Sequence, residues 1–201
     1  MFKKIMSVLL IAVLMASFIG CAKSEVSSGA VSEATNGEAN EIAVDFTNEI
    51  AGGKAYKGTH NYLEYNETLE VNKDSKGNYK VIYNYDNQID EVYKIGTEYS
   101  IYINGELDTE YYSNEELKEM VDAAIEDIEF YPTDSLEVFD LDIDSDTKKA
   151  NGKDGYLVSG IYDDNTEYEY YYNSDGSYFE LTDDYDVVRI DLDDTIIVEL
   201  P

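Results

Sequence analysis

The fold of this chain is decided by residues 113–129, which have the sequence SNEELKEMVDAAIEDIE. Ser113 is followed three residues later by Glu116, a capping box that predicts the start of a helix. Because the apolar residues that follow form one stripe, they have to be buried against another layer. We expect the helix to end before Pro132. The stripe consists of Leu117, Met120, Val121, Ala124, Ile125 and Ile128. The opposite, outer side of the helix consists of Glu119, Asp122, Glu126 and Asp127.

On both sides of this helix the chain alternates between apolar and polar residues, as half-buried strands do. Asn104-Gly105 predicts a tight hairpin turn. A weaker pattern predicts a second helix from about Glu41 to Ala51. The predicted strands cover residues 59–71, 79–85, 89–95, 99–103, 106–112, 136–141, 156–162, 167–172, 177–181, 185–192 and 195–200. The sequence therefore predicts an α+β fold, a strongly curved antiparallel sheet (an incomplete barrel of about ten strands) packed on one or two helices.

The N-terminus has the features of an export signal. Met1–Lys4 is basic, residues 5–19 are almost entirely apolar, and Gly20-Cys21 follows them. An apolar run of roughly 15 residues is shorter than the ~20 that a membrane-spanning helix needs. The segment resembles the bacterial lipoprotein signal, in which a small residue precedes a cysteine that is lipidated before cleavage. The resemblance implies that residues 1–20 are a signal peptide and that Cys21 carries two acyl chains, enough for stable membrane anchoring.

The sequence after Cys21 divides into a linker and one domain. Residues 21–40 contain no aromatic side chain and few large apolar ones, so we expect a flexible linker. Residues 41–201 have the length of a single globular domain. This organisation implies a protein held on the extracytoplasmic face of the cell membrane by its lipid.

The charge of the chain limits its partners. It contains 14 Lys and Arg against 44 Asp and Glu, a net charge of −30. Nucleic acid is excluded as a partner because phosphate binding requires many basic side chains. An anionic bilayer would repel the domain, so the lipid has to provide the membrane attachment. We expect a monomer.

Residues 140–146 contain four aspartates, the composition of a calcium loop. In a loop that starts at Asp142, however, Thr147 stands where an EF-hand requires Gly, and Lys153 stands where it requires Glu. We therefore predict a solvated strand edge and no metal site. We also expect no cofactor.

Three further features have more than one interpretation. His60, the only histidine, cannot form a histidine pair or a zinc triad, and we expect it at or near the surface. Arg189, the only arginine, would form either a cross-strand ion pair or a grip for an anionic ligand. The 20 tyrosines, five of them within residues 162–172, would serve either as strand formers or as a binding surface.

The order of elements resembles that of the LolA-like lipoprotein-carrier fold, which also includes anchored lipid-binding lipoproteins. The predicted last strand, residues 195–200, and the terminal Pro201 contribute to this resemblance. The resemblance implies an apolar cavity between the sheet and the helices, and thus a non-catalytic protein that binds a lipid or another apolar ligand. The alternative is an envelope interaction module with exposed tyrosines. No motif identifies a carboxylate pair, so we do not expect a hydrolase.

Overall fold

A computed structural model describes residues 33–140, 146–150, 153–161 and 165–201. This part of the chain contains two helices, α2 (Glu33–Ala51) and α3 (Asn114–Asp140). Eleven strands form one sheet. They are β1 (Tyr56–Tyr62), β2 (Glu67–Lys73), β3 (Tyr79–Tyr85), β4 (Gln88–Ile95), β5 (Glu98–Ile103), β6 (Glu106–Asp108), β7 (Asp146–Ala150), β8 (Lys153–Ile161), β9 (Glu167–Asn173), β10 (Tyr178–Asp183) and β11 (Asp186–Leu192).

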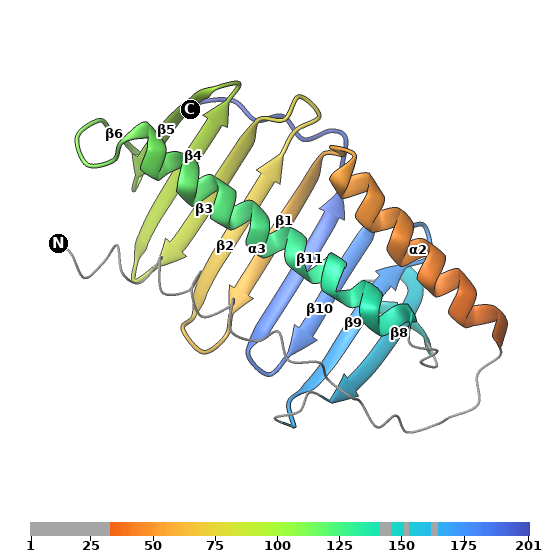
Figure 1. The fold of residues 1–201 in the computed structure, drawn as a ribbon. Helices are drawn as coiled ribbons and strands as arrows, with labels where there is room; N and C mark the ends of the chain where they lie inside the picture. The colour runs from red at the N-terminus through yellow and green to blue at the C-terminus, as the bar shows by residue number, and fades with distance from the viewer. Residues whose placement is uncertain (1–32, 141–145, 151–152, 162–164) are drawn as a thin grey trace.

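The sheet is open, and every pair of neighbouring strands is antiparallel. Its order is β6-β5-β4-β3-β2-β1-β11-β10-β9-β8-β7, so β1 and β11 join two meanders at the centre. Both helices lie on the same face, and α3 runs obliquely across most of the strands (Figure 1). The prediction of an α+β fold with an open, curved antiparallel sheet packed on helices is confirmed.

The capping box at the start of α3 forms as predicted. The Glu116 carboxylate accepts from the Ser113 backbone N–H at 2.8 Å, and the Ser113 hydroxyl accepts from the Glu116 N–H at 3.3 Å. The apolar stripe faces the sheet, with Val121 and Ile128 completely buried. One outer-face assignment is wrong, because Asp127 points toward the sheet and its side chain is 8% exposed.

The predicted end of α3 before Pro132 is also wrong, since the helix continues through the proline to Asp140. The continuation is held by contacts with β9. Ser135 is buried, and its hydroxyl lies 2.8 Å from the Tyr172 hydroxyl. Leu136, which we expected to begin a strand, packs against the core from this second part of the helix. Tertiary contacts therefore outweigh the helix-breaking tendency of proline.

Helix α2 begins at Glu33, eight residues before the expected start, within the segment predicted as a linker. Ala39 and Ala43 are buried in the same core as Phe46 and Ile50. Small residues at positions 39 and 43 let the helix approach its neighbours closely. The linker prediction failed for residues 33–40 because it counted only large apolar side chains.

Besides residues 136–141, three strand predictions need correction. Residues 59–71 form the ends of two strands, joined by a turn in which Asn66 has a φ of 53°. The strand after Asn104-Gly105 stops at Asp108, although both turn residues have the expected positive φ. Residues 195–200 form no strand and instead run as an extended segment across the strand ends.

The two faces of the sheet differ in character. The helix-covered face carries one continuous apolar core that extends from α2 to β5. The other face carries cross-strand ion pairs, such as Lys57 with Glu70 at 2.8 Å and Lys80 with Glu91. It also has a small apolar cluster of Leu157, Tyr171 and Tyr178. The described residues therefore form two layers, and neither of their helices lies on the second face of the sheet, which we call the uncovered face.

Candidate functional site

A group of polar side chains lies within the layer between α3 and the centre of the sheet. Its centre is His60 on β1, which is completely buried. The His60 Nδ1 lies 2.8 Å from an Asp127 oxygen on α3, and Nε2 lies 2.9 Å from an Asp186 oxygen on β11. The Tyr62 hydroxyl donates to the same Asp127 oxygen at 2.9 Å. His60 thus joins the helix to both halves of the sheet, and its expected surface position is wrong.

The two carboxylates determine the charge of this histidine. Burial by itself lowers the pKa of His60, but the hydrogen bonds to Asp127 and Asp186 and their negative charges raise the pKa to about 9. His60 is therefore protonated at neutral pH and donates through both nitrogens. Burial and the nearby Asp127 charge raise the pKa of Tyr62, which stays a neutral donor.

This arrangement is suited to holding α3 on the sheet and not to catalysis by a general base. We call His60, Tyr62, Asp127 and Asp186 the His60 clamp. A general base needs one free imidazole nitrogen, and both nitrogens of His60 are directed at carboxylates. A metal ligand has the same requirement. The second Asp127 oxygen, Oδ1, is buried and has no hydrogen-bond partner among the described residues.

A second polar group lies closer to α2. Lys73 on β2 is buried, and its Nζ donates to the carbonyl oxygen of Ile50 at 3.3 Å. The same Nζ lies 3.9 Å from the Glu129 carboxylate, which accepts from the Tyr56 hydroxyl at 3.0 Å. Burial raises the pKa of Glu129, and the Lys73 charge partly offsets this effect. These bonds tie both helices to β1 and β2.

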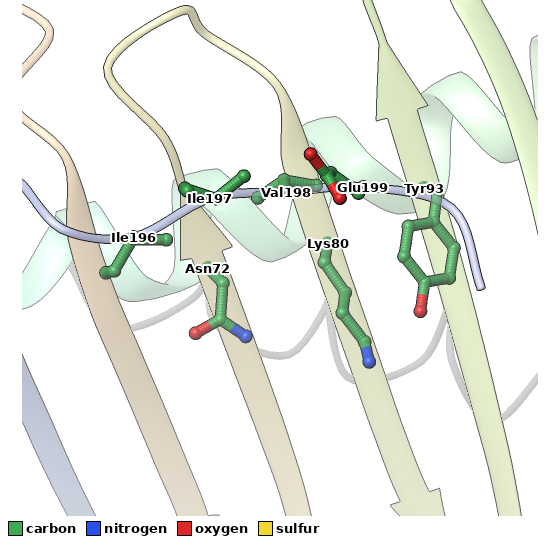
Figure 2. A pocket seen from close by; sticks show the side chains of 7 residues that line it. All are labelled: Asn72, Lys80, Tyr93, Ile196, Ile197, Val198 and Glu199. Atoms are coloured by element: carbon green, nitrogen blue, oxygen red, sulfur yellow. The ribbon is translucent and has the colours of Figure 1, made fainter.

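On the uncovered face, the C-terminal segment forms the wall of a shallow hollow of about 510 Å³. Figure 2 shows Ile196–Glu199 crossing above Asn72, Lys80 and Tyr93, on the side of the sheet away from α3. Val198 is buried, and its N–H points to the Asp74 carboxylate at 3.5 Å. Asp74 also accepts from the backbone N–H groups of Lys76 and Asn78, so its turn is a firm anchor for the segment.

One end of the strands exposes large apolar side chains. Leu63 and Tyr65 lie in the turn between β1 and β2, and Tyr185 lies in the turn between β10 and β11. Each is at least half exposed. The Leu63 N–H donates to the Tyr185 carbonyl oxygen at 2.7 Å, so the two turns touch. We call Leu63, Tyr65 and Tyr185 the apolar tip.

The structure also places the other residues that the sequence analysis singled out. Arg189 forms the cross-strand ion pair, with its Nε 2.7 Å from the Glu180 carboxylate. Most of the tyrosine cluster is buried, since Tyr168, Tyr170 and Tyr172 belong to the core. Cys21 and the signal segment lie outside the described residues, as does most of the aspartate run at 140–146.

The described residues were also compared with the requirements of a metal site and of a membrane-spanning helix. Among the described side chains, no three or more His, Cys, Asp or Glu come together in a way that could hold a metal ion. Within the same residues, neither helix is long and apolar enough to cross a membrane.

Comparisons with known proteins assign no family to the chain. No family model matches it, and a search of curated proteins found no significant match. The site therefore has to be interpreted from its own geometry.

Sequence reasoning missed the His60 clamp and the apolar tip for one reason. Taking residues 59–71 as one strand placed the turn residues Leu63 and Tyr65 inside a strand. It also hid the set Tyr56, Gly58, His60 and Tyr62, which alternates along β1 and faces α3. Within that set, the small Gly58 and the polar His60 were the sequence signal that a helix packs closely on this face of β1.

Proposed function

We propose that this protein is a monomeric, non-catalytic lipoprotein, anchored through Cys21 to the extracytoplasmic face of the cell membrane, whose domain binds another protein. The Gly20-Cys21 pair after a short apolar run supports the anchor. Because an anionic bilayer would repel so acidic a domain, the anchor is the only membrane attachment that we propose.

One contrast in the structure supports the proposal that the domain binds another protein. The layer between α3 and the sheet is closely packed at Gly58, where an added Cβ atom would lie 2.5 Å from Cγ2 of Ile128. Large apolar side chains are exposed at several places on the described residues, and the three of the apolar tip lie in two turns that touch each other. Exposed apolar groups that gather at one place are typical of interaction sites.

The architecture favours a second proposal, the binding of a lipid or another apolar ligand. An open sheet crossed by a helix is the arrangement that the carrier resemblance implies. An acyl chain would have to enter beside Leu117 and Val121, which are buried, and to separate α3 from the sheet. Native mass spectrometry of the purified protein with a panel of fatty acids and phospholipids distinguishes the two proposals. A retained acyl ligand favours the carrier function, and a bare protein mass favours protein binding.

Cell fractionation tests the anchor. The wild-type protein should be found with membranes, and Cys21→Ser should move it to the soluble or secreted fraction. Ser27→Ala, a small change in the same region of the sequence, is the control and should leave the protein with membranes. Metabolic labelling with an alkyne fatty acid should mark the wild type and the control but not Cys21→Ser. Membrane retention of unlabelled Cys21→Ser would contradict the proposal.

A further inference from the structure

The apolar tip is a preformed surface. The Asp183 carboxylate accepts from the N–H groups of Tyr185 at 2.8 Å and Asp186 at 2.7 Å, which fixes this turn. Asp186 is held in turn by His60, and the Leu63–Tyr185 hydrogen bond fixes the other turn. Little backbone ordering entropy would therefore be lost when a partner binds to these turns.

The charge around the apolar tip is strongly negative. The strand register brings the turns at residues 63–66, 86–87 and 184–185 to the same end of the sheet, at the bottom of Figure 1. The chain has no Lys or Arg in residues 58–72, 81–93 or 154–188. The basic side chains of β1–β4 lie toward the opposite strand ends, namely Lys57, Lys73, Lys80 and Lys94.

Carboxylates at this end affect one another. Burial and the nearby Asp86 charge raise the pKa of Glu67, and burial, with a contribution from Asp186, raises the pKa of Asp183. Glu64 and Asp184 are exposed beside the apolar tip. An incoming cationic group would relieve this repulsion, whereas an anionic one would add to it.

We infer that the apolar tip, with its border of Glu64 and Asp184, is the docking surface for a Lys- or Arg-rich protein segment that also carries apolar side chains. This inference rests on the proposed binding function and specifies its partner. Leu63, Tyr65 and Tyr185 provide the apolar anchors, and tyrosine is among the residues enriched at such contacts. The carboxylates around them select a basic partner and exclude anionic membranes.

A direct binding assay tests the inference. The full protein is purified as its host processes it, from membranes in nonionic detergent or from the soluble fraction, so the assay works whether or not Cys21 is lipidated. The probe is a fluorescent peptide of lysine and leucine repeats, followed by anisotropy. A lysine–serine peptide and a glutamate–leucine peptide are the comparison probes, and vesicles of anionic phospholipid test the membrane alternative.

Two variants locate the site. Leu63→Ser with Tyr185→Ser removes apolar anchors and should weaken lysine–leucine binding by about tenfold or more. Glu64→Gln with Asp184→Asn removes two charges from the border and should weaken it several-fold, with a smaller salt dependence. Thermal unfolding of each variant shows that the fold is retained, and the second variant remains informative if the first does not fold.

A matched control separates this site from general attraction to an acidic protein. Glu119→Gln with Glu126→Gln removes the same two charges from the exposed side of α3, and it should leave binding within about twofold of the wild type. Equal losses in both charge variants, equal binding of the lysine–serine peptide, or binding to anionic vesicles would overturn the inference. Anchoring is measured separately, so it can fail or succeed independently of this result.

Discussion

The His60 clamp makes stability depend on pH in a range where few other groups of the protein titrate. We predict that the wild-type protein loses stability between about pH 6.5 and pH 9, and that His60→Gln removes this dependence. The physical reason is that protonated His60 bridges two carboxylates in a buried layer. Deprotonation leaves one nitrogen without a hydrogen and both carboxylates without a cation.

The structure gives the expected magnitude. The pKa of His60 is raised from 6.5 to about 9. One pKa unit corresponds to about 1.4 kcal/mol, so the protonated form stabilises the fold by roughly 3 kcal/mol. Because the folded-state pKa is the higher of the two, the full contribution is present below pH 6.5. It declines as the pH rises and is absent above about pH 9.

Urea unfolding followed by tyrosine fluorescence measures this effect, since the chain has 20 tyrosines and no tryptophan. At pH 6.5, His60→Gln should reduce the free energy of unfolding by roughly 3 kcal/mol, because two acidic groups lose their cation. Asn84→Gln, an exposed change on β3, is the control and should follow the wild-type profile.

Two results would refute this reasoning. One is a wild-type free energy of unfolding that stays constant from pH 6.5 to pH 9. The other is a decline of the same size in His60→Gln, which would assign the pH dependence to different groups. A double-mutant cycle with Asp127→Asn gives a further check, because the two changes should not be additive if the residues interact directly.

Three further predictions concern packing, each checked by urea unfolding. Val121→Asp buries an unpaired charge beneath α3 and should unfold the domain, whereas Asp122→Ala on the exposed side should change stability by less than about 0.5 kcal/mol; similar effects would contradict the orientation of α3. Gly58→Ala should cost about 1–3 kcal/mol because the new methyl group overlaps Ile128, although alanine suits a strand better than glycine; a gain in stability would show that this contact is loose. Asp74→Ala should make the C-terminal segment more accessible to carboxypeptidase and cost about 1–3 kcal/mol, and unchanged digestion would mean that another contact holds the segment.

The sequence predicted the layers of this fold well, because they depend on local patterns. The capping box and apolar stripe of α3 are both present, and the alternation of the strands predicted an antiparallel sheet. The pairing of β1 with β11 was not predictable in this way. It joins residues about 130 positions apart, and no local pattern specifies which distant strands become neighbours.

The failures occurred where tertiary contacts override local preference. Pro132 should end a helix, but Ser135 and Leu136 gain buried partners if the helix continues. Residues 33–40 have the composition of a linker, yet Ala39 is buried in the core that α2 shares with the sheet. The partners of His60 lie on α3 and β11, so its burial and charge could not be inferred from its neighbours in the sequence.

The polar bonds within the α3–sheet layer determine how α3 lies on the sheet. An apolar stripe alone allows the helix to shift by one turn and still bury Leu and Val side chains. Such a shift would separate Asp127 from His60, Glu129 from Tyr56, and the Met120 carbonyl oxygen from the Tyr83 hydroxyl, now 2.6 Å away. Each buried polar group left without a partner costs about 1–3 kcal/mol. The loss of all three hydrogen bonds would therefore make the shifted position of α3 less stable, even if the apolar stripe were buried equally well. The second nitrogen of His60 holds Asp186, whose N–H donates to Asp183 in the turn that carries Tyr185. The buried polar layer thus orders the exposed surface that we infer to be the docking site.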